Sequence, residues 1–308
     1  MMRALLRGVL VGASRSGVLR RQVTGRAATR NLALRFVAGD TLDDGLHAAR
    51  RLARQDRTVT LNSLGEEVAD PAQARAGAKT YLETLARVGE EGLPAGVSVK
   101  PTQLGLDVAP QLCLELLAEV AAAADQIGAH VTLDMEGSPV TAATIALVER
   151  LHAAGHRHVG CALQAYLRRT PGDVERLSAL GASLRLCKGA YAEPPAVAHQ
   201  RRAEVDASFA TLADWLLEHG SYPRLATHDD RLVDRARNTA ARLGRGRDDF
   251  EFQMLYGVRP RLQDALVRDG YRLRVYVPFG DQWYPYFMRR LAERPANLVF
   301  FLRALRGG

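Results

Sequence analysis

Residues 96–135 read GVSVKPTQLGLDVAPQLCLELLAEVAAAADQIGAHVTLDM, and this stretch predicts a strand, a helix and a second strand in that order. The two end runs, Gly96–Lys100 and His130–Met135, are short and rich in β-branched residues, as buried strands are. Between them, leucines such as Leu112 and Leu116 recur at the spacing of a helix. A strand, a helix and a strand in succession indicate parallel pairing through a right-handed crossover.

The same alternation continues along the chain, and no Pro/Gly/Ser-rich linker interrupts it. The predicted strands are Thr58–Ser63, Gly96–Lys100, His130–Met135, His158–Gln164, Ser183–Cys187, Arg224–Thr227, Phe250–Met254 and Arg272–Pro278. An open doubly wound sheet would also alternate in this way, but its glycine-rich nucleotide fingerprint is missing after the early strands. The sequence therefore favours the α/β class and a closed (βα)8 TIM barrel.

Extra helices are predicted before the first strand, over Leu32–Gln55, where Asp40 or Thr41 is suited to cap a helix that starts near Leu42. We expect them to cover the bottom or the side of the barrel. The predicted domain division is a basic tail over residues 1–30 and a single barrel domain over residues 31–308. A chain of 308 residues suits one such barrel, which typically needs about 250 residues.

The composition is that of a protein with a large core, since 47% of the residues are hydrophobic. No uncharged apolar run approaches the roughly 18 residues of a membrane span. Cys113, Cys161 and Cys187 are far apart and form no CxxC pair, so we expect neither disulfides nor a structural zinc site. This cysteine usage indicates a reducing compartment.

The net charge of +8 is concentrated in part in residues 1–30, which contain several arginines and no acidic residue. This pattern resembles a mitochondrial transit peptide, and it also suits a disordered basic tail. A weak contact with an anionic membrane surface is compatible with it. We expect a cytoplasmic protein. The basic tail also allows a peripheral position at the inner face of the cell membrane.

Polar residues alternate with apolar ones in the predicted strands, and this parity directs them into the barrel lumen. They are Ser98, Lys100, Thr132, Asp134, Gln164, Arg185, Cys187, Glu251, Gln253, Arg274 and Tyr276. Many stand late in their strands, at the end where barrels of this class carry their active sites. Burying the ionisable groups among them costs on the order of several kcal/mol per ion, unless they pair with one another or with a ligand. The set as a whole therefore predicts a ligand site.

Two further segments point to the same mouth of the barrel. In CKGAY, Gly189 permits close approach of the backbone, and Lys188 with Arg185 could neutralise a pyrophosphate. In YPYFMRRLAE, the residues Tyr286, Arg289, Arg290 and Glu293 fall on one face of a helix. Adjacent arginines suit bidentate capture of a carboxylate or a phosphate.

These segments resemble the proline dehydrogenase family in its bacterial monofunctional form. The resemblance is carried by LDMEG, QAY, RLCKGAY, ATHD, FQMLYG, VYVPFG and YFMRRLAE, which occur in the family's order from about Arg35 to the C-terminus. It implies a distorted (βα)8 barrel that holds FAD non-covalently and oxidises L-proline to pyrroline-5-carboxylate, with electrons passed to a membrane quinone.

The resemblance also implies roles for individual residues. Asp134 and Arg185 match the catalytic centre beside the flavin. The matches to the substrate site are Lys100, Tyr276, Tyr286, Arg289, Arg290 and Leu255. The matches to the cofactor site are Met135, Gln164, Arg185, Cys187, Gly189, Ala190, Thr227 and His228, to which the KGA reading adds Lys188. Some relatives carry a tryptophan after KGAY where this sequence has Ala192. The resemblance therefore does not imply which side chain lies beside the flavin at this position.

The residues by themselves leave other functions open. A Schiff-base aldolase would also place a lysine, Lys100 or Lys188, inside a barrel near a carboxylate. A non-enzymatic protein that binds anions would account for the charge, although no nucleic-acid recognition motif is present. A metal-dependent hydrolase is disfavoured, because His156, His158 and His228 lack an evident set of strand-end partners.

Overall fold

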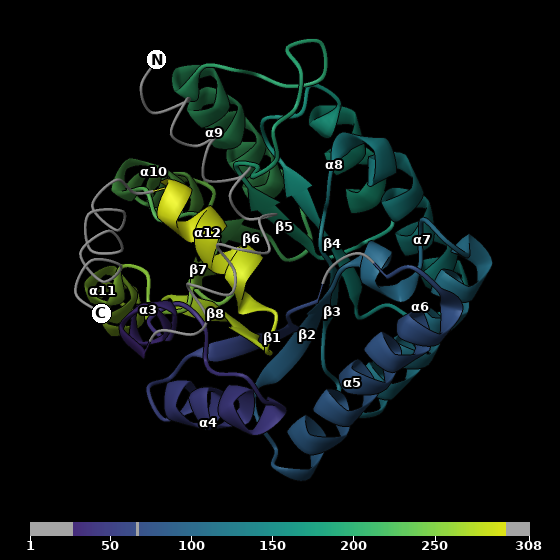
Figure 1. Cartoon of the computed structure of the whole chain (residues 1–308). Coiled ribbons are helices and arrows are strands. Elements are labelled where there is room, and N and C mark those ends of the chain that lie inside the picture. Colours follow the sequence, from purple (N-terminus) through teal and green to yellow (C-terminus); the bar gives the residue numbers. More distant parts are fainter. Residues whose placement is uncertain (1–26, 66–67, 294–308) are drawn as a thin grey trace.

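The computed structural model describes residues 27–65 and 68–293, in which parallel strands close into a barrel in chain order (Figure 1). The strands are β1 (Thr58–Ser63), β2 (Ala95–Val99), β3 (Val131–Leu133), β4 (Val159–Gln164), β5 (Leu184–Cys187), β6 (Arg224–Ala226), β7 (Glu251–Leu255) and β8 (Arg272–Phe279). Pairing of β8 with β1, for example Tyr276 with Thr60, closes the ring. The predicted (βα)8 barrel is confirmed, and every strand lies within two residues of its predicted bounds.

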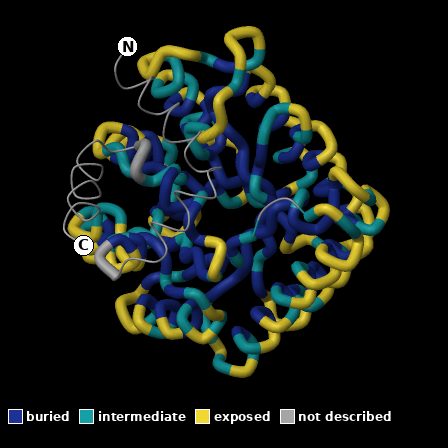
Figure 2. Tube along the Cα trace, viewed as in Figure 1, coloured by how far each residue is buried: buried dark blue, intermediate teal, exposed yellow. Residues whose placement is uncertain are grey.

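Helices surround the barrel. They are α3 (Ala27–Ala33), α4 (Leu42–Ala53), α5 (Pro71–Glu90), α6 (Pro110–Gln126), α7 (Thr141–Ala153), α8 (Thr170–Ser178), α9 (Arg202–His219), α10 (Asp230–Arg242), α11 (Pro260–Arg268) and α12 (Trp283–Glu293), with the 3-10 turns η1 (Pro101–Leu104) and η2 (Ser138–Val140). Figure 2 shows the buried strands at the centre and the exposed outer faces of the helices. This is the layering that alternating strands and amphipathic helices produce.

The extra N-terminal helices are present, and α4 covers the side of the barrel. Thr41 is its N-cap: the Thr41 hydroxyl accepts a hydrogen bond from the Asp44 N–H at 3.2 Å, and the Asp44 carboxylate accepts one from the Thr41 N–H at 3.0 Å. Leu46 of α4 belongs to the apolar cluster that contains Val59 of β1 and Val275 of β8. The predicted tail overlaps α3 at residues 27–30, and residues 1–26 lie outside the described part of the chain.

Because α4 occupies the outer face of β1 and β8, the helix that follows β8 takes another position. Figure 1 shows α12 lying across the mouth of the barrel instead of along its side. Its residues Trp283 and Phe287 pack against Phe36 after α3 and Leu64 after β1. The chain thus brings the arginines of α12 to the carboxyl ends of the strands.

A layer of charged side chains lies lower in the lumen, as the strand parity predicted. Glu251 accepts a hydrogen bond from Nε of Arg274 at 2.7 Å and lies 3.7 Å from Nε of Arg224. The Gln253 amide donates to the same carboxylate at 2.5 Å. Burial by itself would raise the pKa of Glu251, but Arg274 and Arg224 lower it to about 2. The carboxylate is therefore ionised and holds the two guanidinium groups.

Candidate active site

Asp134 is the centre of the polar cluster at the mouth of the barrel. It follows β3, and its carboxylate accepts hydrogen bonds from the Ser98 hydroxyl at 2.6 Å and from the Tyr276 hydroxyl at 2.9 Å. The Arg185 guanidinium forms a direct ion pair with it, and Nζ of Lys100 lies 3.9 Å away. Residues from β5 and β8, and from the ends of β2 and β3, thus meet at one carboxylate, as expected for side chains that point into the lumen.

The electrostatics of this cluster fix its protonation. Burial opposes ionisation of Asp134, but Arg185 and Lys100, with the hydrogen bonds from Ser98 and Tyr276, lower its pKa below the usual value. Burial, followed by the charge of Asp134, raises the pKa of Tyr276 well above 10. At neutral pH the site therefore holds an ionised Asp134 beside the Arg185 guanidinium, and a protonated Tyr276 phenol.

Glu136 is a member of this region that the sequence analysis missed. Its carboxylate accepts hydrogen bonds from the Thr102 hydroxyl at 2.6 Å and from the Thr102 N–H at 3.1 Å. Thr102 lies in η1, the turn directly after Lys100, so Glu136 fixes the backbone that carries this lysine. Burial raises the pKa of Glu136. The signal was the parity of Thr132 and Asp134, which continues to position 136.

The segment after β5 is held against the end of β4. The side-chain oxygen of Gln164 accepts a hydrogen bond from the Ala190 N–H at 3.2 Å, and its amide donates to the Glu136 carbonyl at 2.9 Å. Gly189 has a φ of +114°, and a Cβ at this position would lie 2.2 Å from the Tyr166 ring. Only glycine suits this backbone, as the KGA motif predicted. Gln164, Gly189 and Ala190 are thus brought together.

Lys188 and Cys187 are placed differently from each other. Nζ of Lys188 lies 2.5 Å from Asp206 and 3.3 Å from Asp229, so this lysine and Arg185 pair with different carboxylates. The Cys187 thiol donates to the Leu163 carbonyl at 3.4 Å, and burial raises its pKa to about 11. Cys187 is therefore a protonated thiol that packs beside the site.

The remaining predicted cofactor positions lie along the same rim. Met135 and Thr227 are buried, and the Thr227 hydroxyl accepts a hydrogen bond from the Asp229 N–H at 3.2 Å. Nε2 of His228 accepts a hydrogen bond from the Leu255 N–H at 3.0 Å, which ties the end of β6 to the end of β7. The structure thereby places Leu255 beside His228.

The α12 helix carries the predicted arginine pair. Tyr286 is buried, Arg289 and Arg290 are half-buried, and the Arg290 guanidinium lies 5.2 Å from the centre of the Tyr286 ring. Tyr276 packs against the apolar cluster to which Tyr286 belongs, so α12 is joined to the Asp134 cluster through two tyrosines. The side chain of Glu293 lies outside the described residues.

The histidines and cysteines of residues 27–65 and 68–293 provide no evidence of a metal centre. No group of three or more His, Cys, Asp or Glu residues there is placed to hold a metal ion. Nδ1 of His156 pairs with Asp125 at 2.7 Å, and the described cysteines are free thiols. The mouth of the barrel, rich in cations around one carboxylate, is the candidate active site.

Comparisons with known proteins agree with this location. The family model described as proline dehydrogenase matches residues 45–303. The chain is 37% identical over 292 residues to proline dehydrogenase 2 of Bacillus subtilis, which covers 95% of this chain and 96% of that protein. It is also 37% identical over 282 residues to the proline dehydrogenase of Deinococcus radiodurans, covering 90% of this chain and 91% of that one.

The fold has a counterpart among solved structures. Proline utilization A (PutA) of Bdellovibrio bacteriovorus superposes with a TM-score of 0.81 at 25% identity, over 94% of this chain and 36% of that chain. This chain thus spans about a third of the length of that protein. With the family match over most of the barrel, these similarities disfavour the aldolase and the non-enzymatic alternatives. The chain belongs to the proline dehydrogenase family and is an oxidoreductase of proline catabolism.

Proposed function

We propose that this chain binds FAD non-covalently at the carboxyl ends of its strands and oxidises L-proline to pyrroline-5-carboxylate, with a membrane quinone as the electron acceptor. The observation that carries the proposal is the meeting of Lys100, Arg185 and Tyr276 at Asp134, next to α12, against whose apolar cluster Tyr276 packs. FAD, when bound, supplies the acceptor for the hydride that leaves the proline carbon next to nitrogen.

The residues present fit this cofactor. Arg185 is 6% exposed, and its Nη1 has no hydrogen-bond partner among the described residues although Nη2 is paired. A buried cation with an unused donor suits an electron-rich ring that gains negative charge. The residues that would hold FAD are Met135, Gln164, Arg185, Cys187, Lys188, Gly189, Ala190, Thr227 and His228. Lys188 would contact FAD at the edge of the cofactor site, because its ammonium group is already paired with the carboxylates of Asp206 and Asp229.

The substrate carboxylate would be held by Lys100, Arg289 and Arg290. Arginine forks bind a carboxylate with two parallel hydrogen bonds, which fixes its orientation as well as its position. Tyr276, Tyr286 and Leu255 would line the apolar sides of the proline ring. Fixing the ring in this way accelerates the reaction by keeping one carbon in line with the acceptor.

Asp134 has an orienting role in this proposal. Its lowered pKa makes it a weak base, and its oxygens already accept hydrogen bonds from Ser98 and Tyr276 and pair with Arg185. It keeps the phenol and the guanidinium in place while the amine proton leaves by another route. The net positive charge suits contact with an anionic membrane surface, where a membrane quinone would be reached. No helix in the described ranges has the length and apolarity of a membrane span.

The carboxylate clamp is tested by Arg290→Lys. Lysine keeps the charge but loses the fork, so we expect KM for L-proline to rise about 10- to 100-fold, the equivalent of one or two charge-assisted hydrogen bonds. We expect kcat to change less. The measurement is L-proline-dependent reduction of a soluble quinone by the FAD-loaded protein.

The matched control is Arg268→Lys, at an exposed arginine in the last turn of α11. It should leave both constants unchanged. An unchanged KM in Arg290→Lys would remove this arginine from the clamp, and absence of proline oxidation in the unmodified protein would reject the function itself.

A further inference from the structure

A cavity of about 410 Å³ lies at the opposite end of the barrel from the candidate active site. It opens between the amino ends of β1 to β3 and β8 and the carboxyl ends of α5 and α6. Its volume falls within the roughly 300–1,000 Å³ that small-molecule sites occupy. The lining residues that matter here are Thr58, Val88, Leu93, Ile127, His130 and Arg274.

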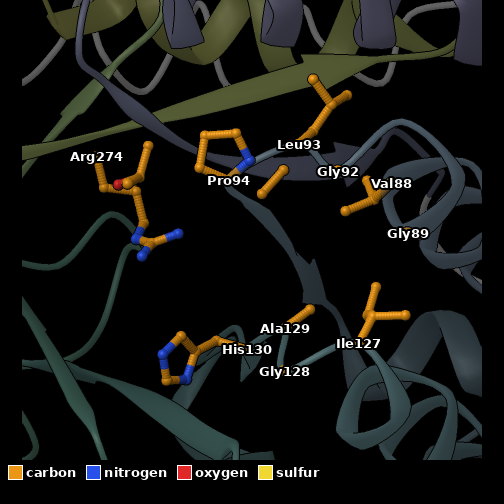
Figure 3. A pocket seen from close by; sticks show the side chains of 12 residues that line it. Val88, Gly89, Gly92, Leu93, Pro94, Ile127, Gly128, Ala129, His130 and Arg274 are labelled. Atoms are coloured by element: carbon orange, nitrogen blue, oxygen red, sulfur yellow. The ribbon is translucent and has the colours of Figure 1, made fainter.

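The lining is divided by polarity. In Figure 3 the Arg274 guanidinium and the His130 ring lie on one side of the view, and Val88, Leu93 and Ile127 lie on the other. Arg274 is 8% exposed, so its charge is buried against the cavity. A ligand that fits this lining has one charged end and one apolar end.

The buried charges beside the cavity are unequal in number. Arg224 and Arg274 face one carboxylate, that of Glu251. Burial lowers the pKa of Arg224 to about 10, so it remains a cation at neutral pH. Burial, followed by the charges of Arg224 and Arg274, lowers the pKa of His130 to about 3, and this ring is neutral. One positive charge is left over in a region of low dielectric, where it attracts an anion strongly.

Polar atoms with unused hydrogen-bonding capacity lie on the cavity wall, at His130, and in the charged layer next to it, at Arg224. Nδ1 of His130, which lines the cavity, and Nε and Nη2 of Arg224, which is 1% exposed, have no hydrogen-bond partner among the described residues. Buried polar groups are nearly always satisfied by protein, water or a ligand. The excess positive charge beside the cavity and the unpartnered His130 nitrogen on its wall, which donates in the Nδ1–H tautomer, together favour an anionic ligand.

We propose that this cavity binds a small monocarboxylate, with its carboxylate on Arg274 beside His130 and its apolar part against Val88, Leu93 and Ile127. The site is separate from the proline site, although Arg274 and Tyr276 are alternate residues of β8. Binding there stabilises the fold without taking part in catalysis.

Benzoate is the probe, with benzamide as its neutral counterpart and acetate as the carboxylate without an apolar body. Binding to the FAD-loaded full-length protein is measured by calorimetry under argon, with and without saturating L-proline. We expect saturable benzoate binding that persists with L-proline, weaker binding of acetate, and none of benzamide.

Two pairs of variants at the rim locate the site. Ile127 is 39% exposed, and an added Cβ at Gly92 meets no atom within 4 Å at a φ of +58° that Asp and Asn tolerate. Ile127→Glu and Gly92→Asp should each weaken benzoate binding about tenfold by charge repulsion. Ile127→Gln and Gly92→Asn, the neutral controls, should change it about twofold at most. Proline oxidation should be the same in all four.

Three results would overturn the proposal. Absence of saturable benzoate binding up to about 10 mM would show that only water satisfies these groups. Binding that L-proline displaces and that the charged variants leave unchanged would assign benzoate to the catalytic mouth. Equal binding of benzoate and benzamide would show that the cavity selects apolar molecules without regard to charge.

Discussion

Glutamine in place of Glu251 is expected to lower the free energy of unfolding by about 3–5 kcal/mol, because it leaves two buried guanidinium groups without their anion. Glu251 is 1% exposed and touches Arg274 at 2.7 Å and Arg224 at 3.7 Å. The measurement is urea unfolding followed by circular dichroism at pH 7. The substitution keeps the volume of the side chain and one acceptor oxygen for Arg274 and Gln253, so the loss reports mainly on the missing negative charge.

The control is Asp248→Asn, which breaks the exposed pair with Arg272 at 2.9 Å. Exposed pairs contribute less than about 1 kcal/mol, so this variant should unfold almost as the unmodified protein does. Similar losses in the two variants would contradict a special role for the buried layer.

The lowered pKa of Glu251 also predicts how the stability difference between the unmodified protein and Glu251→Gln depends on pH. In the folded protein this pKa is about 2, against an ordinary value of 4.5. The ionised carboxylate therefore contributes its full stability above pH 4.5, and this contribution is lost as the pH falls through about 2. The difference in stability between the unmodified protein and Glu251→Gln should narrow over this window, and a constant difference would argue against an ionised Glu251.

Asp134→Ala is expected to reduce kcat/KM for L-proline by about 10²- to 10³-fold, the equivalent of about 3–4 kcal/mol. The carboxylate holds the Arg185 guanidinium and accepts a hydrogen bond from the Tyr276 hydroxyl at 2.9 Å, so its removal releases two groups at once. Asp134→Asn, which keeps the shape but not the charge, should lose nearly as much. The measurement is steady-state oxidation of L-proline across pH.

A buried aspartate outside the barrel provides the control for the two Asp134 variants. Asp173→Asn removes the partner of Arg169 in α8 at 2.7 Å, outside the barrel, and should lower stability without lowering kcat/KM. If Asp134→Asn kept kcat and shifted only its pH profile, Asp134 would be a proton acceptor, and the orienting role proposed for it would be wrong.

The convergence at Asp134 could be predicted from the sequence because strand parity is a strict geometric rule. In most of the predicted strands the polar residues stood at alternate positions, and Ser98, Arg185 and Tyr276 all reach the same carboxylate in the structure. A barrel leaves only one interior for such side chains. The fold and the centre of the site therefore followed from the same pattern.

Other features depended on tertiary packing that the sequence does not display. The position of α12 across the mouth follows from α4 covering β1 and β8. Both helices are amphipathic, so the sequence of either one is compatible with packing against the side of the barrel. Glu136 was missed because the predicted strand ended at Met135, so the parity was not followed one residue further. The pairing of Lys188 with Asp206 joins residues from different segments, which single-sequence reasoning does not connect.

The most direct test is a visible spectrum of the purified protein under argon, before and after addition of L-proline. We expect a flavin absorption band that bleaches when L-proline is added, because the site around Asp134 would hold the ring of the substrate against the cofactor. A flavin band that does not respond to L-proline would contradict the assigned substrate, and a colourless protein that takes up no FAD would contradict the cofactor on which the proposed reaction depends.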